Sequence, residues 1–140
     1  MPVDHLRPDL EVSLEVGPYA PRVARFYVTQ VGRPSPDLRD AISLLTSEMV
    51  TRAVHQWAAA DVLKLREWMS SDVVRVEILA SGQPLEVTVD PDDQHYELLL
   101  LNQIADRWSV GNGAPSPCMW FEIDHHEAAM QSKPSAVTAH

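Results

Sequence analysis

Residues 44–55 read LLTSEMVTRAVH, which has the pattern of the second half of an amphipathic helix. The helix is predicted to begin at the Ser-Pro pair 35–36, a side-chain cap followed by proline in the first helical position. At about 100° per residue, Glu48, Arg52 and His55 share one flank. That flank borders an apolar stripe formed by Leu38, Ala41, Ile42, Leu45, Met49 and Ala53. An acid, a base and an imidazole therefore lie at the edge of a buried face, where a pocket wall would be.

The composition indicates a single globular domain. The chain has 140 residues, enough for one substantial core. Its net charge of −9 disfavours binding to nucleic acids, whose phosphates it would repel. Cys118 is the single cysteine, so no internal disulfide is possible and a reducing compartment is expected. There is no signal-peptide pattern, and no apolar run approaches the ~18 residues of a membrane helix. We expect a cytoplasmic protein that binds neither nucleic acid nor membrane.

Hydrophobic periodicity predicts the remaining elements. Alternation predicts strands at residues 10–16, 73–79, 85–90, 108–111 and 119–123. Helical spacing predicts helices at residues 19–31, 36–55 and 95–106. No glycine or proline separates Asp37 from Gly82, so composition extends the second helix, or starts another, through Met69. The turn at 81–82 predicts that strands 73–79 and 85–90 form a hairpin.

The predicted order of elements is β-α-α-β-β-α-β-β. This order favours the α+β class: a two-layer sandwich of a mostly antiparallel sheet with about three helices on one face. Residues 1–9 are expected to form an arm, residues 10–124 the domain, and residues 125–140 a disordered tail.

With the SEMVTRAVH segment at residues 47–55 on the second helix, this order resembles the GHKL-type ATPase domains, which have the histidine-kinase-like ATPase fold. The nearest group is the anti-sigma-factor serine kinases and the small actinobacterial regulators like them, whose second helix typically reads Ser-Glu-Leu-Val-Thr-Asn-Ala-x-x-His. LLNQIADRWSV at residues 100–110 is similar to the family's closing helix and next strand, and WFE at 120–122 to its final strand. The resemblance covers roughly residues 10–124.

The resemblance implies an ATP site made of three kinds of residue. A glutamate on the second helix is the base, an asparagine four residues later binds Mg²⁺, and an aspartate at a strand end reads adenine. Glu48 matches the base, Asp90 matches the aspartate in position, and His55 is taken as a further position of the family's ATP site. Arg52 stands where the asparagine is expected, and a guanidinium, which only donates, cannot ligate Mg²⁺.

The phosphate-binding part of that site also departs from the family. Residues 91–98 lack the glycines that follow the aspartate and precede the closing helix. The seven residues 91–97 replace a longer lid, and three of them, Asp92, Asp93 and Glu97, would repel the phosphates. These changes imply a degenerate site with weak or no ATP binding, in which Glu48 is a vestigial base. No cofactor or metal is expected.

Three functional hypotheses follow. The first is a regulatory protein resembling an anti-sigma factor, which binds a sigma factor or an antagonist of the STAS type. The resemblance also implies a possible homodimer, with Arg22, Arg25 and Phe26 near an interface. The alternative is an active serine/threonine protein kinase that uses ATP and Mg²⁺ to phosphorylate an antagonist. A third is a scaffold in which residues 58–71 mediate assembly.

Each candidate residue also has a purely structural interpretation. Glu48 and Arg52 have the i, i+4 spacing of a surface ion pair, and His55 can cap or pack at the helix end. Asp90 can simply begin the next helix. Cys118 has the sequence context of a packed thiol. The histidines at 125–126 lie in the predicted tail, and no metal site is predicted there.

Overall fold

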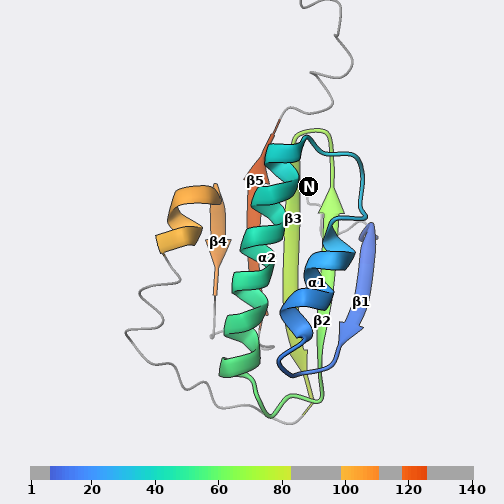
Figure 1. Cartoon of the computed structure of the whole chain (residues 1–140), viewed down its shortest axis with the longest axis vertical. Helices are drawn as coiled ribbons and strands as arrows, with labels where there is room; N and C mark the ends of the chain where they lie inside the picture. The colour runs from blue at the N-terminus through green and yellow to red at the C-terminus, as the bar shows by residue number, and fades with distance from the viewer. Residues whose placement is uncertain (1–6, 83–98, 111–117, 126–140) are drawn as a thin grey trace, which may run out of the picture.

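A five-stranded antiparallel sheet forms one layer of the protein, and helices cover one of its faces (Figure 1). The computed structural model describes residues 7–82, 99–110 and 118–125. The elements are β1 (Leu10–Leu14), α1 (Ala20–Val28), α2 (Pro36–Gln56), β2 (Val62–Met69), β3 (Val73–Ser81), β4 (Arg107–Ser109) and β5 (Cys118–Asp124), with a further helical segment at residues 99–104. The sheet order is β1-β2-β3-β5-β4, and every pair is antiparallel. The predicted two-layer α+β sandwich is confirmed.

The second helix, α2, begins as its sequence predicts. Ser35 has extended backbone, and its Oγ accepts a hydrogen bond from the N–H of Leu38 at 3.2 Å. Asp37 lies in the first turn, where the helix dipole favours an acid. The predicted apolar stripe is buried, with Ile42 and Leu45 almost completely removed from solvent. The cap, the first turn and the core-facing side were therefore all readable from local sequence.

The first helix, α1, packs through small residues. Ala20, Ala24 and Val28 recur every four positions and are buried, and the helix lies against α2 and β1. Two larger apolar residues of the helix lie on its solvent-facing side, since Val23 is 38% and Phe26 61% exposed. Small side chains let α1 approach the second helix closely, and this leaves the large ones on the outer side.

The prediction of helix through Met69 is wrong. The backbone leaves helical geometry at Trp57, with φ −121° and ψ 46°, and residues 62–69 form β2. Leu63 and Leu65 are buried, whereas Val62, Lys64 and Arg66 are half-buried. This period of two defines a strand. Pairing with β1 and β3 decides the conformation here, because it hydrogen-bonds the backbone of β2 along both edges.

Most of the segment 58–71 is therefore an inner strand. Both edges of β2 are hydrogen-bonded within the sheet, so its backbone is not available to another chain. The scaffold hypothesis, in which this segment mediates assembly, loses the feature on which it rested.

The predicted strand at residues 85–90, and with it the hairpin to residues 73–79, lies outside the described residues. One edge of β3 pairs with β2 from Val62↔Ser81 to Met69↔Val74, and the other pairs with β5 over residues 73–79. The described elements between α2 and β4 therefore include β2, a strand that the predicted order lacked.

Gly82 permits the turn that follows β3. Its φ is +124°, a region that L side chains rarely adopt. A Cβ built there would lie 2.8 Å from the backbone nitrogen of Asp61, whose N–H donates to the carbonyl of Ser81 at 2.8 Å. Both the backbone angle and the space beside it therefore require glycine.

Replacing Gly82 with alanine should lower the free energy of unfolding by about 1–3 kcal/mol, because the methyl group must displace the backbone at Asp61. Urea unfolding followed by circular dichroism measures the change. Gly17→Ala is the matched control: no atom lies within 4 Å of the new Cβ, and its φ is not positive. Equal losses in the two variants would show that the turn does not need glycine.

Candidate functional site

Glu48, Arg52 and His55 lie on one flank of α2, as their spacing predicts. Glu48 is half-buried and His55 is exposed, but Arg52 is buried, with only 5% of its surface exposed. The predicted surface position of the Glu48–Arg52 pair is therefore wrong for Arg52, while the pairing itself stays a prediction. The flank carries a permanent positive charge into the interior of the protein.

Three polar side chains of this helix bond to its own carbonyl groups. The Nδ1 of His55 lies 2.9 Å from the carbonyl oxygen of Thr51, and a hydrogen bond there requires the proton on Nδ1. The hydroxyl of Thr51 donates to the carbonyl of Ser47 at 2.7 Å, and that of Ser47 donates to Leu44 at 3.1 Å. His55 thus bonds at the end of the helix, as the structural interpretation predicted, while its role at an ATP site stays a prediction.

The predicted site is described only in part. Its α2 residues are placed, whereas Asp90 and the short segment 91–98 lie outside the described residues. The meeting of Glu48 with Asp90 across a nucleotide pocket therefore stays a prediction.

The helix also brings polar atoms into the core that sequence analysis missed. Thr46 Oγ1, Gln56 Oε1 and Trp57 Nε1 are buried and have no hydrogen-bond partner. Thr46 is fully buried, four residues after Ile42 on the core-facing side, so the periodicity of the stripe could have located it. A buried polar atom without a partner costs about 1–3 kcal/mol, so these atoms oppose the stability that the helix supplies.

Glu67 is the most unusual ionisable residue that the structure describes. It is fully buried, and neither carboxyl oxygen has a hydrogen-bond partner. It lies on the core face of β2, between Leu10 of β1 and Val76 of β3. Burial, and then the charge of Asp9, raise the pKa of Glu67 to about 9. At neutral pH the core therefore contains a neutral carboxylic acid.

The buried acid makes stability depend on pH. The folded-state pKa of Glu67, about 9, lies above its ordinary value of 4.5, so the unfolded chain releases a proton that the folded chain keeps. The stability contributed by the neutral acid is complete below pH 4.5 and is lost as the pH rises through 9. The free energy of unfolding should fall by up to about 1.4 kcal/mol per pH unit within this window.

Glu67→Gln should remove this slope, because the amide is neutral at every pH. Urea unfolding at several pH values between about 5 and 8.5 measures it. Glu11→Gln, on the exposed face of the neighbouring β1, is the control and should keep the slope. Parallel pH profiles for the wild type and Glu67→Gln would mean that Glu67 does not bind the extra proton.

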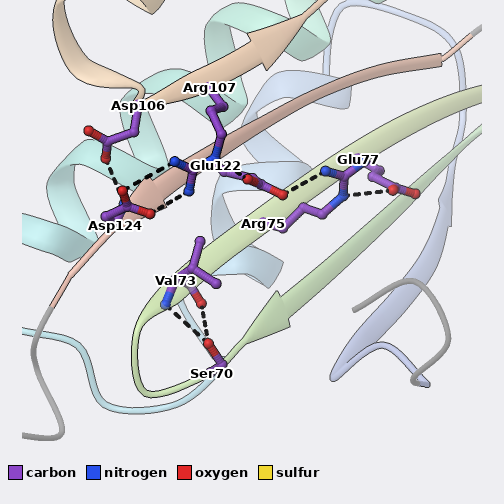
Figure 2. Close-up of polar contacts among 8 residues, drawn as sticks. All are labelled: Ser70, Val73, Arg75, Glu77, Asp106, Arg107, Glu122 and Asp124. Carbon is purple, nitrogen blue, oxygen red and sulfur yellow. Dashed lines mark hydrogen bonds and ion pairs between the residues drawn. The ribbon is translucent and has the colours of Figure 1, made fainter. Parts of the chain in front are cut away.

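The opposite face of the sheet carries a network of ion pairs (Figure 2). Arg75 donates from Nη1 to Glu122 at 2.7 Å and from Nε to Glu77 at 2.9 Å. Arg107 donates to the second oxygen of Glu122 at 2.6 Å and also pairs with Asp124. Glu122 on β5 therefore joins β3 to β4 through two arginines. The alternation of charged residues within these strands is the sequence signal for this face, although it did not reveal the partners.

The pKa values in this network show that its charges are paired. Burial would raise the pKa of Glu122, but hydrogen bonds from Arg107 and Arg75 outweigh it and hold that pKa below its ordinary value. Burial would lower the pKa of Arg75, but its bonds to Glu122 and Glu77 raise it overall. The Arg75 guanidinium also lies 4.3 Å from the ring centre of Trp120. These groups stabilise the sheet and offer no acid or base for chemistry.

Arg75→Met should lower the free energy of unfolding by about 2–4 kcal/mol, since it removes one close arginine partner from each of two poorly exposed carboxylates, Glu77 and Glu122. Arg107→Met is the matched control. Its side chain is 49% exposed, and its loss should cost at most about 1 kcal/mol. Chemical unfolding of both variants tests the difference, and an equal effect would show that burial does not strengthen the inner pairs.

The thiol of Cys118 and clusters of metal ligands are the two other kinds of group that could support chemistry. Burial, and then the charge of Glu77, raise the pKa of Cys118 to about 11, so the thiol stays protonated at neutral pH. This supports its interpretation as a packed residue. Within residues 7–82, 99–110 and 118–125, no three His, Cys, Asp or Glu side chains lie close enough together to hold a metal ion.

Comparison with known proteins identifies no relative: no protein-family model matches the chain, and no curated protein matches it in sequence. The candidate site therefore stands on its residues and their geometry. In the described part of the chain, no helix has both the length and the apolar character that crossing a membrane requires.

Proposed function

We propose that the chain is a regulatory protein with a degenerate GHKL-type ATPase domain, which acts, like an anti-sigma factor, by binding other proteins. The burial of Arg52 carries this proposal. The resemblance places a Mg²⁺-binding asparagine at this position. A buried guanidinium brings a fixed positive charge and five donors but no oxygen ligand, so it occupies the place of the cation and cannot hold one.

The arrangement of the elements supports the same family. A helix with a serine cap lies across the central strands of an antiparallel sheet, and Glu48 and Arg52 lie on its flank. This agrees with what the resemblance implies for a histidine-kinase-like ATPase fold. This support comes from the arrangement of the elements, and it adds to the support from the SEMVTRAVH segment at residues 47–55.

The proposed mechanism is competition for a partner by surface contact. Glu48 is a vestigial base, and the protein is a pseudokinase that needs neither ATP nor Mg²⁺. The partner is a sigma factor or an antagonist of the STAS type, and the net charge of −9 suits a basic binding surface on it. A homodimer with Arg22, Arg25 and Phe26 near its interface, which the resemblance also implies, is an alternative use of the surface that leaves Phe26 exposed.

Isothermal titration of the protein with millimolar Mg-ATP should give no binding heat, and the melting temperature should not change. The expected cause is the positive charge of Arg52 in place of a metal ligand, together with the missing glycines and short lid at residues 91–98 that the sequence indicates. Micromolar affinity would instead support the alternative, an active serine/threonine kinase with Glu48 as its base.

Partner binding needs a separate measurement. Purified sigma factors and STAS-type proteins from the native cell should be titrated one by one, and one of them should bind with micromolar affinity or better. Failure of all of them would refute the anti-sigma assignment while leaving the ATP result unaffected.

A further inference from the structure

A cavity of about 380 Å³ lies between the end of β1 and the start of α1. Leu14, Val16, Val23 and the rings of Tyr19 and Tyr27 are among its lining residues. The volume is enough for one large apolar side chain. The cavity lies directly at a sheet edge, so a backbone paired to that edge could place a side chain in it.

The neighbouring surface of α1 is apolar and exposed. Tyr19 and Phe26 are 70% and 61% exposed, and Val23 lies between them on the same side of the helix. The ring of Phe26 packs edge-on against Tyr27, with the ring centres 5.5 Å apart. This surface extends the apolar lining of the cavity outward.

The strand beside the cavity offers unpaired backbone groups. β1 is the last strand of the sheet, and within the described ranges it pairs only with β2. An edge strand presents a row of N–H and C=O groups that an extended peptide can join. The edge and the cavity together provide main-chain bonding and a pocket for a side chain.

The charges near β1 decide whether a second copy of this chain or a different protein would pair with the strand. Glu11 lies on β1, and Glu15 is the first residue after the strand; both are exposed, as is Ser13 between them. Lys64 and Arg66 already pair with Glu11, at 3.6 and 3.1 Å, whereas Glu15 has no ion pair among the residues that the structure describes. β1 contains no basic residue, so a second copy paired here would bring only acids to its charged face.

We infer that the edge of β1 binds an extended segment of a partner protein in which basic and apolar side chains alternate. The apolar side chains continue the face of Leu14 and Val16, and one of them fills the cavity. A basic side chain on the other face meets Glu15. This inference rests on the proposed function only in making the chain a protein-binding module, because the surface involves no residue of the ATP site.

A labelled ten-residue peptide of alternating lysine and valine with one central phenylalanine tests this inference. Fluorescence anisotropy with the full chain at about 150 mM salt should show saturable binding, because that salt screens non-specific attraction. The control peptide has the same composition with its lysines in one block, which cannot alternate. Equal affinity for the two peptides would overturn the inference, since only net charge would then be recognised.

Two variants locate the binding site. Glu15→Lys should weaken the alternating peptide about tenfold, whereas Asp40→Lys, with the same change in net charge on exposed α2, should change its affinity less than about twofold. Val23→Trp, which fills the cavity, should also weaken binding about tenfold. Equal effects of Glu15→Lys and Asp40→Lys would overturn the location. A wild-type dimer that Val23→Trp dissociates would also overturn it, because a second copy of the chain would then occupy the surface.

Partner titration and peptide titration have separable outcomes. If no sigma factor or STAS-type protein binds but the alternating peptide does, the surface stands and the proposed function fails. If a partner binds equally well to the wild type and Glu15→Lys, the function stands and the partner uses another surface.

Discussion

The packing of α2 against the apolar face of β3 is the contact on which the other elements depend. Val74, Val76 and Ile78 of β3 are completely buried, and Ile42 and Leu45 of α2 face the same core. Because β3 pairs along both edges, β2 and β1 extend the sheet to one side and β5 and β4 to the other. Without the helix, the strand at the centre of this ladder would expose its apolar face to water, a loss that scales with the area uncovered.

The two faces of the sheet place glutamates in opposite electrostatic environments. Glu122 on the outer face receives two arginines, and they hold its pKa low despite burial. Glu67 on the inner face receives none, so burial raises its pKa to about 9 and the group enters the core neutral. Most of the buried ionisable groups that the structure describes are thus part of the packing.

Binding by surface is the function that we propose from these features. In that proposal, the buried arginine at position 52 argues against a metal ion at the site that the family resemblance implies. Figure 1 shows β1 at one edge of the sheet, beyond α1 from that site's helix. The cavity lies between the end of β1 and the start of α1. A domain that has lost its nucleotide can keep regulating if its partner is recognised elsewhere, and the chemistry of β1 indicates what such a partner would carry.

The sequence alone determined the features whose physics acts within a turn or two of chain. The serine cap, the stripe of α2, the period-two patterns of β1 and β3, and the alignment of Glu48, Arg52 and His55 all followed from local spacing. The tertiary structure decided what depends on distant neighbours. Residues 62–69 became a strand because β1 and β3 pair with them, and β5 pairs with the other edge of β3. The burial of Arg52, the isolation of Glu67 and the partners of Arg75 belong to the same class, because each depends on contacts with residues far away in sequence.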